Sequence, residues 1–152
     1  MSIMCKLYSA IDIAKYVINY AIDINRPISN LKLQKILYYI QGNFLSELGY
    51  PAFEEEIIAW KHGPVVPEVY FEFNSYSAYN ITDKYVIDDK FTPEKCELEI
   101  LNNVIKDKSN KDPWELVNDT HNETPWKEYY EQGKNIMIPK EKIKEFFESL
   151  KK

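Results

Sequence analysis

The spacing of apolar residues predicts a helix near the start of the chain. Between residues 11 and 24, isoleucine, valine and alanine recur every three or four positions, which is the period of one helix face. Ser9 followed by Asp12 resembles a capping box that begins this helix, and Asn25 and Pro27 end it.

A second helix is expected from residue 30 to about residue 48. Ile28 and Leu33 flank the capping residue Ser29 as a hydrophobic staple, an apolar stripe follows to Leu48, and Gly49 is a typical stop. The adjacent residues Tyr38 and Tyr39 cannot both face one side of a helix. We therefore expect one of them to point outward or into a groove.

The middle of the chain predicts short strands. Residues 56–61 (EIIAWK) are β-branched and aromatic, and they run into a turn at His62-Gly63-Pro64. Pro67 suits the first position of a short helix. Residues 85–87 are a possible second strand, and residues 136–138 a possible edge strand.

Helical patterns return in the last third. Helix starts are expected at Thr92-Pro93, Asp112-Pro113 and Thr124-Pro125, with Gly133 as the stop of the last of these. The final helix is expected to bury Ile143, Phe146, Phe147 and Leu150. Six to seven helices with a small two- to three-stranded sheet make a mostly helical α+β fold, and we expect residues 1–152 to form a single domain.

The charge is unevenly distributed. The net charge is −5, but residues 51–100 hold four basic and eleven acidic residues, a local charge of −7. A nucleic-acid-binding protein usually shows a basic stripe, so the acidic middle argues against direct DNA binding. We interpret the run Glu54-Glu55-Glu56 as a solvated face.

Cysteine usage and the first residues predict the compartment. Cys5 and Cys96 lie far apart in the sequence and form no disulfide framework or CxxC pair. No secretory leader and no membrane-spanning stretch is recognisable. We expect a cytoplasmic protein with two reduced thiols.

The sequence shows no catalytic motif. His62 and His121 lie about 60 residues apart, and no phosphate-binding loop, nucleophile elbow or metal-ligand cluster accompanies them. We interpret His62 as a turn residue and His121 as a partner of the last carbonyls of a helix. The pattern predicts no enzyme activity, no metal and no cofactor.

The three tryptophans allow two interpretations. Trp60, Trp114 and Trp126 each lie near the end of an expected element. They are either core residues or anchors of a protein interface, because tryptophan is enriched at the centre of interfaces.

Three segments resemble one family. They are LKLQKILYYIQG at residues 31–42, AWKHGPVVPEVY at residues 59–70 and THNETPW at residues 120–126. In order and spacing they are similar to the Panacea domain of SocA-like, phage-associated antitoxins. The resemblance implies a protein that neutralises a cognate toxin by direct binding. In one branch it implies an adaptor that delivers the toxin to the ClpXP protease.

The resemblance also indicates which residues are candidates for binding a partner. Residues 59–70 either organise a core junction or border a toxin-binding groove, because Gly63 and two prolines make a rigid apolar turn. His62 departs from the tyrosine that is usual there. The candidate partner-binding residues are Trp60, Lys61, His62, Val65, Val66, Tyr70 and Trp126. Residues 74–90 and 106–112 match no motif and suit partner specificity. A nucleic-acid-binding regulator and a small metal-assisted hydrolase at His62 or His121 remain the alternatives, and the oligomeric state is open.

Overall fold

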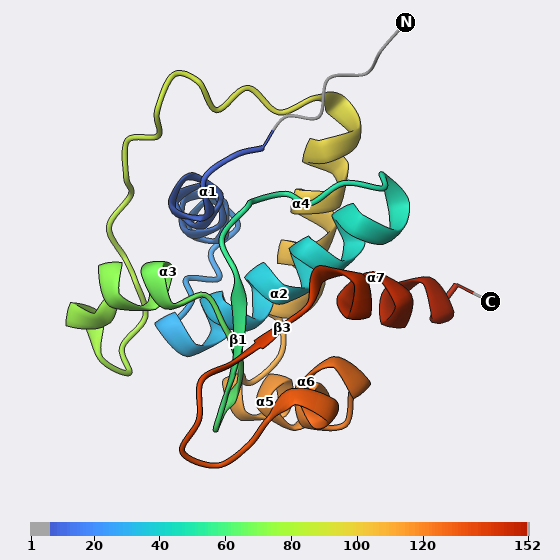
Figure 1. Ribbon diagram of the computed structural model, residues 1–152. Helices are drawn as coiled ribbons and strands as arrows, with labels where there is room; N and C mark the ends of the chain where they lie inside the picture. The colour runs from blue at the N-terminus through green and yellow to red at the C-terminus, as the bar shows by residue number, and fades with distance from the viewer. Residues whose placement is uncertain (1–6, 152) are drawn as a thin grey trace, which may run out of the picture.

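Helix α2 (Asn30–Glu47) is the centre of the fold. The computed structural model describes residues 7–151, so Cys5 lies outside the described residues. Thirteen of the eighteen α2 residues are buried, because other elements pack on most sides of the helix. These are α1 (Ala10–Asp23), α3 (Pro67–Glu72), α4 (Lys95–Ser109), α5 (Pro113–His121), α7 (Lys140–Ser149) and the strand β2 (Gly63–Val65) (Figure 1).

The first two helices begin and end as their sequences predict. The Ser9 hydroxyl accepts a hydrogen bond from the Asp12 amide at 3.0 Å, and the Ser29 hydroxyl accepts one from the Lys32 amide at 3.3 Å. Each serine satisfies an amide of the first turn that has no partner within the helix. Gly49 follows α2 at a φ of 82°, the left-handed conformation that ends helices.

A three-stranded antiparallel sheet lies beside α2. Strand β1 (Ile57–Trp60) is central, β2 (Gly63–Val65) pairs with it as a hairpin, and β3 (Ile136–Ile138) pairs on the other side. The predicted edge strand at 136–138 is confirmed. The turn was expected at His62-Gly63-Pro64, but Gly63 and Pro64 already belong to β2, where they pair with Trp60 and Ala59.

The predicted strand at residues 85–87 is wrong. The Asn19 side chain accepts a hydrogen bond from the Tyr85 amide at 2.9 Å and donates one to the Tyr85 carbonyl at 2.8 Å. These side-chain bonds replace the ladder of a strand, so the segment stays irregular. The connection from residue 77 to residue 94 passes around α1 (Figure 1).

Helix α3 (Pro67–Glu72) begins at Pro67 as expected, and a 3-10 turn, η1 (Asn74–Tyr76), follows it. Helix α4 begins two residues later than expected from Thr92-Pro93, because Glu94 and Glu97 form the capping box there. Helix α6 (Thr124–Tyr129) ends before Gly133.

The end of the chain corrects one burial prediction. Helix α7 buries Ile143 and Phe147, and Phe146 is half-buried against the core. Leu150, the C-cap residue of α7, is 62% exposed. The predicted burial of Leu150 is wrong.

The fold is mostly helical, with seven α-helices and one small sheet in the described residues. None of the helices in residues 7–151 combines the length and the apolar character needed to cross a bilayer.

Candidate functional site

The three segments whose sequences resemble one family, residues 31–42, 59–70 and 120–126, meet at one place, which we call the motif junction. It is formed by α2, by the β1–β2 hairpin leading into α3, and by the end of α5 with α6. Polar side chains of the first and third segments bind backbone atoms of the second. The hairpin is thereby held by hydrogen bonds from two sides.

Helix α2 holds one side of the hairpin. The side-chain oxygen of Gln34 accepts a hydrogen bond from the Val66 amide at 2.9 Å, and the ammonium of Lys35 donates one to the Pro64 carbonyl at 3.1 Å. Both side chains are buried, so each bond satisfies a backbone group that water cannot reach.

Lys35 is an unusual core residue. Its side chain is 0% exposed, and burial lowers its pKa to about 7. Gly63 makes room for it: a Cβ atom at residue 63 would lie 2.6 Å from Lys35 Cε and 2.8 Å from Thr120 Oγ1. Gly63 also has a φ of 111°, which favours glycine.

The α5–α6 segment holds the other side. The Trp126 indole donates a hydrogen bond to the Trp60 carbonyl at 2.7 Å, and a ring nitrogen of His121 lies 3.0 Å from the Lys61 carbonyl. His121 was expected to bind the end of its own helix, but the tertiary fold brings the hairpin carbonyl to its ring. The His121 ring also stacks on Trp126, with centroids 3.9 Å apart, and burial lowers the pKa of His121.

Tyr38 and Tyr39 both point into the junction. Tyr38 OH donates to Glu123 Oε1 at 2.9 Å, and Tyr39 OH donates to Glu123 Oε2 at 2.8 Å. Of the two directions expected for one tyrosine, outward or into a groove, the outward one is wrong: both side chains are buried, and the Glu123 carboxylate accepts from both hydroxyls. Burial raises the pKa of Glu123 and of both tyrosines.

A cavity of about 340 Å³ lies beside the hairpin, and we call it the aromatic groove. Five of the seven candidate residues line it, namely Trp60, Lys61, His62, Val65 and Tyr70. The other lining residues are Asn30, Leu31, Gln34, Asn74, Ser77, Ala78 and Trp114. Three separate stretches of the chain, residues 30–34, residues 60–78 and Trp114, thus contribute to one concave surface.

The two remaining candidates lie elsewhere. Val66 is 1% exposed in the core, and Trp126 packs beneath the hairpin against His121. Trp114 is the main residue that sequence reasoning did not assign to the site. It is 58% exposed, and its ring meets the His62 ring edge-to-face at 5.1 Å. Trp114 lies at the start of a helix, outside the hairpin segment. Nothing in the local sequence pattern indicates that its side chain contacts His62.

The aromatic groove combines aromatic rings with few unpaired buried polar groups. Its buried amides are engaged, since Asn30 donates to the Tyr70 carbonyl and Gln34 donates to Asn30. The Trp60 indole NH has no hydrogen-bond partner among the described residues. Lys61 and His62 are exposed at the groove, beside aromatic rings. Such a surface can take an apolar side chain and place a polar group nearby. Within residues 7–151, no three His, Cys, Asp or Glu side chains gather as a potential metal site.

Comparison with known proteins identifies the family. The family model described as "Antitoxin SocA-like, Panacea domain" matches residues 33–127, which include most of the motif junction. Antitoxin SocA of Caulobacter vibrioides (strain NA1000 / CB15N) is 38% identical over 77 residues, which cover 51% of this chain and 41% of that protein. The matched region thus spans less than half the length of this relative. No solved structure matches the chain significantly. The chain belongs to the SocA-like antitoxin family and carries its Panacea domain.

Proposed function

We propose that this chain is an antitoxin that neutralises a cognate protein toxin by binding it directly, and that the aromatic groove is part of the contact surface. The observation that carries the proposal is the convergence of Trp60, Tyr70 and Trp114 on one cavity at an open surface. Exposed and half-exposed tryptophan and tyrosine supply large contact areas at a small entropy cost, which is typical of interface anchors.

The rigidity of the hairpin supports tight association. Side chains from α2, α5 and α6 fix its backbone before any partner binds. A surface that is already ordered loses less conformational entropy when it forms a complex. The proposed mode is therefore docking of the toxin on a preformed site, without catalysis by this chain.

We further propose that the complex forms in the cytoplasm. Cys96 is an unpaired, exposed thiol, which suits a reducing compartment.

The test is co-expression with the product of the adjacent gene. The tagged chain should co-elute with it as a stable complex and relieve its toxicity. Trp114→Ala should weaken the complex about tenfold or more, since truncation of an interface tryptophan commonly costs over 1–2 kcal/mol. Leu150→Ala is the matched control, because Leu150 is an exposed apolar residue on α7, outside the groove.

Two results would change the assignment. Normal binding by a folded Trp114→Ala, Tyr70→Ala double variant would exclude the groove as the contact surface. A shorter half-life of the toxin in the presence of this chain, dependent on ClpXP, would make the chain a delivery adaptor and replace simple blockade.

A further inference from the structure

The outer face of the sheet is apolar where an exposed sheet face is usually polar. In β1, Ile57 and Ala59 are buried in the core, while Ile58 and Trp60 point to the opposite side and are half-buried. Ile58 lies directly opposite Met137 of β3, so the two side chains share this face. Met137 is 48% exposed.

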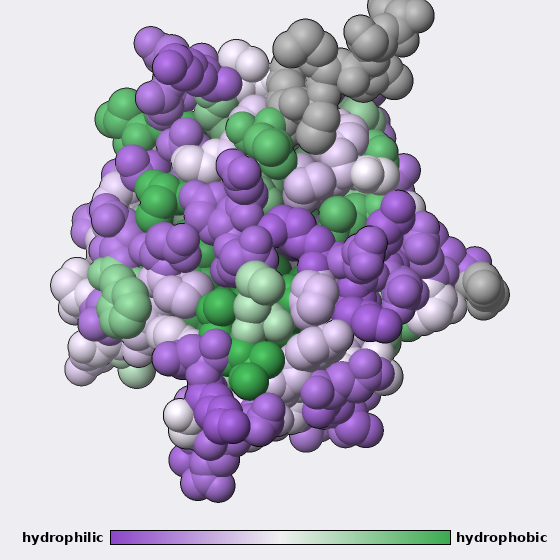
Figure 2. Space-filling model, in the orientation of Figure 1, coloured by the Kyte–Doolittle hydropathy of each residue, from purple (hydrophilic) through white to green (hydrophobic). Residues whose placement is uncertain are grey.

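Helix α3 extends this surface. Phe71 is 64% exposed, and its ring meets the Trp60 ring edge-to-face at 6.2 Å. We call Ile58, Trp60, Met137 and Phe71 the outer sheet face. Figure 2 shows hydrophobic side chains gathered over β1 and β3, bordered by hydrophilic ones. An alternating strand would place polar residues here, so the pattern indicates a face that another molecule covers.

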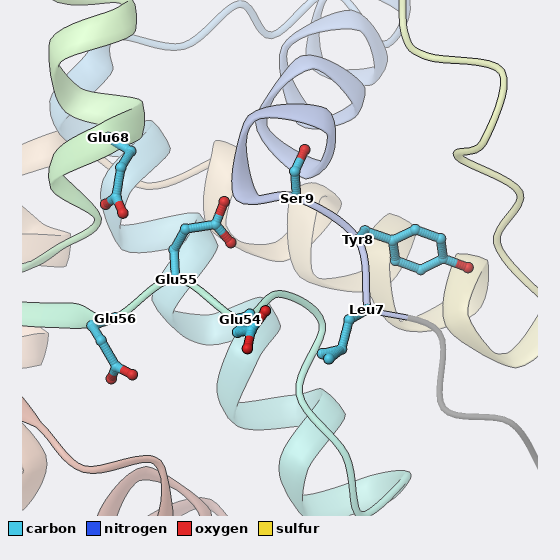
Figure 3. A pocket seen from close by; sticks show the side chains of 7 residues that line it. All are labelled: Leu7, Tyr8, Ser9, Glu54, Glu55, Glu56 and Glu68. Carbon is cyan, nitrogen blue, oxygen red and sulfur yellow. The ribbon is translucent and has the colours of Figure 1, made fainter.

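Acidic side chains border the outer sheet face. A hollow of about 440 Å³ beside β1 and α3 is lined by Glu54, Glu55, Glu56 and Glu68, together with Leu7, Tyr8 and Ser9 (Figure 3). Glu56 is the residue before β1, and Glu68 lies in the first turn of α3. The acidic border therefore lies on the segment that leads into β1 and on α3, and both of these adjoin residues of the apolar face.

Only some of these glutamates are paired with other groups of the chain. Glu55 accepts a hydrogen bond from the Ala10 amide at 3.1 Å, and Lys140 lies 3.1 Å from Glu56. Glu54 and Glu68 form no salt bridge with any residue between 7 and 151. The hollow thus keeps a net negative charge beside an apolar surface.

We propose that the outer sheet face binds a segment of a partner protein that carries apolar residues flanked by lysine or arginine. The apolar residues cover Ile58, Met137 and Phe71, and the basic residues face Glu54 and Glu68. The charge selects this occupant: phosphates of nucleic acids or anionic lipids are repelled, and a second copy related by two-fold symmetry would bring the same glutamates together. Trp60 belongs to both surfaces, so the outer sheet face adjoins the aromatic groove, but Ile58, Met137 and Phe71 do not line the groove and the proposal rests on these three residues.

The test uses a defined probe and the full chain. The probe is a short, fluorescein-labelled amphipathic peptide of leucine and lysine, and the matched peptide has glutamate at every lysine position. In fluorescence anisotropy, the lysine peptide should bind saturably and more weakly at high salt, and the glutamate peptide should not bind. In methyl NMR spectra, the lysine peptide should shift the resonances of Ile58 and Met137.

Substitutions test whether the lysine peptide binds at the outer sheet face. Met137→Ser, and separately the pair Glu54→Gln and Glu68→Gln, should each raise the Kd about threefold to tenfold. Val86→Ser and Glu148→Gln are the controls, since Val86 is 90% exposed and Glu148 is exposed, and neither lines the hollow. These controls should leave the Kd unchanged.

Three outcomes would overturn the proposal. They are equal binding of the glutamate peptide, an unchanged Kd for Met137→Ser, and methyl shifts that miss Ile58 and Met137. Light scattering adds one more: a wild-type dimer that Met137→Ser dissociates would assign the face to a second copy. Because the probe is not the toxin, failure here leaves the groove proposal untouched.

Discussion

The ammonium group of Lys35 donates a hydrogen bond to the carbonyl oxygen of Pro64 at 3.1 Å, inside a region where the lysine side chain has no exposure to solvent. A buried ammonium loses its hydration, and one carbonyl replaces only part of it. The contact joins the central helix to the β2 strand at the position where Gly63 leaves space. The hairpin beside the aromatic groove therefore depends on an ionisable core residue.

The buried lysine should make stability depend on pH. Its pKa is about 7 in the folded chain and about 10.5 when unperturbed, so the unfolded chain binds more protons between these values. Stability should rise with pH from 7 to 9, by up to about 1.4 kcal/mol per pH unit. Urea denaturation at pH 7, 8 and 9 should show this rise in the wild type and a smaller one in Lys35→Met. Equal pH profiles for the two proteins would contradict it.

Glu123 should be a structural residue of the motif junction. In Glu123→Gln, one of the two oxygens that accept from Tyr38 and Tyr39 becomes an amide nitrogen, and a buried hydroxyl loses its acceptor. We expect a loss of about 2 kcal/mol in the free energy of unfolding. Glu148→Gln, at an exposed site on α7, should change it little. A double-mutant cycle with Tyr39→Phe should show coupling between residues 39 and 123, and strict additivity would speak against the shared carboxylate.

Gly63 should tolerate no side chain. Gly63→Ala forces a Cβ against Lys35 and Thr120 and also occupies a φ of 111°. We expect a loss of about 3 kcal/mol, from the backbone strain and the overpacking together. Gly133→Ala is the matched control, because its φ is 77° but no atom lies within 4 Å of the added Cβ. It should cost only about 1 kcal/mol. Thermal unfolding of both variants measures the difference, and similar melting temperatures would mean that the space at residue 63 is not critical.

The contact between α2 and α7 should depend on Gly42. A Cβ at residue 42 would lie 2.3 Å from the Phe147 ring, so Gly42→Ala must displace the ring or the helix that carries it. Overpacking of this kind costs about 1–3 kcal/mol. Amide hydrogen exchange should show faster exchange in α7, with α1 protected as before. Leu150→Ala should leave α7 unchanged, because Leu150 is exposed. Slow exchange throughout α7 in Gly42→Ala would refute the expectation.

Part of the candidate site followed from the sequence. The motif pattern at residues 59–70 singled out Trp60, Lys61, His62, Val65 and Tyr70, and these five line the aromatic groove. Val66 belongs to the same segment but faces the core, and only the register of the chain at the end of β2 decides which valine borders the cavity. Trp114 reaches the groove from an element about fifty residues away, so no local pattern could assign it.

The features that could be predicted from residue types alone are short-range. The caps at Ser9 and Ser29, the stop at Gly49 and the helical start at Pro67 depend on bonds and dihedral angles within a few residues, so their residue types suffice to predict them. Three contacts depend on the packing of distant segments: Tyr85 hydrogen-bonds to Asn19 outside a sheet, residues 63–65 pair with β1, and the Glu123 carboxylate accepts hydrogen bonds from Tyr38 and Tyr39. In each case the partner is distant along the chain or depends on pairing across the sheet. Because these surroundings are buried, a polar group without a hydrogen-bond partner would destabilise the fold. Each group therefore bonds to a partner that lies far away in the sequence, and local patterns cannot predict such partners.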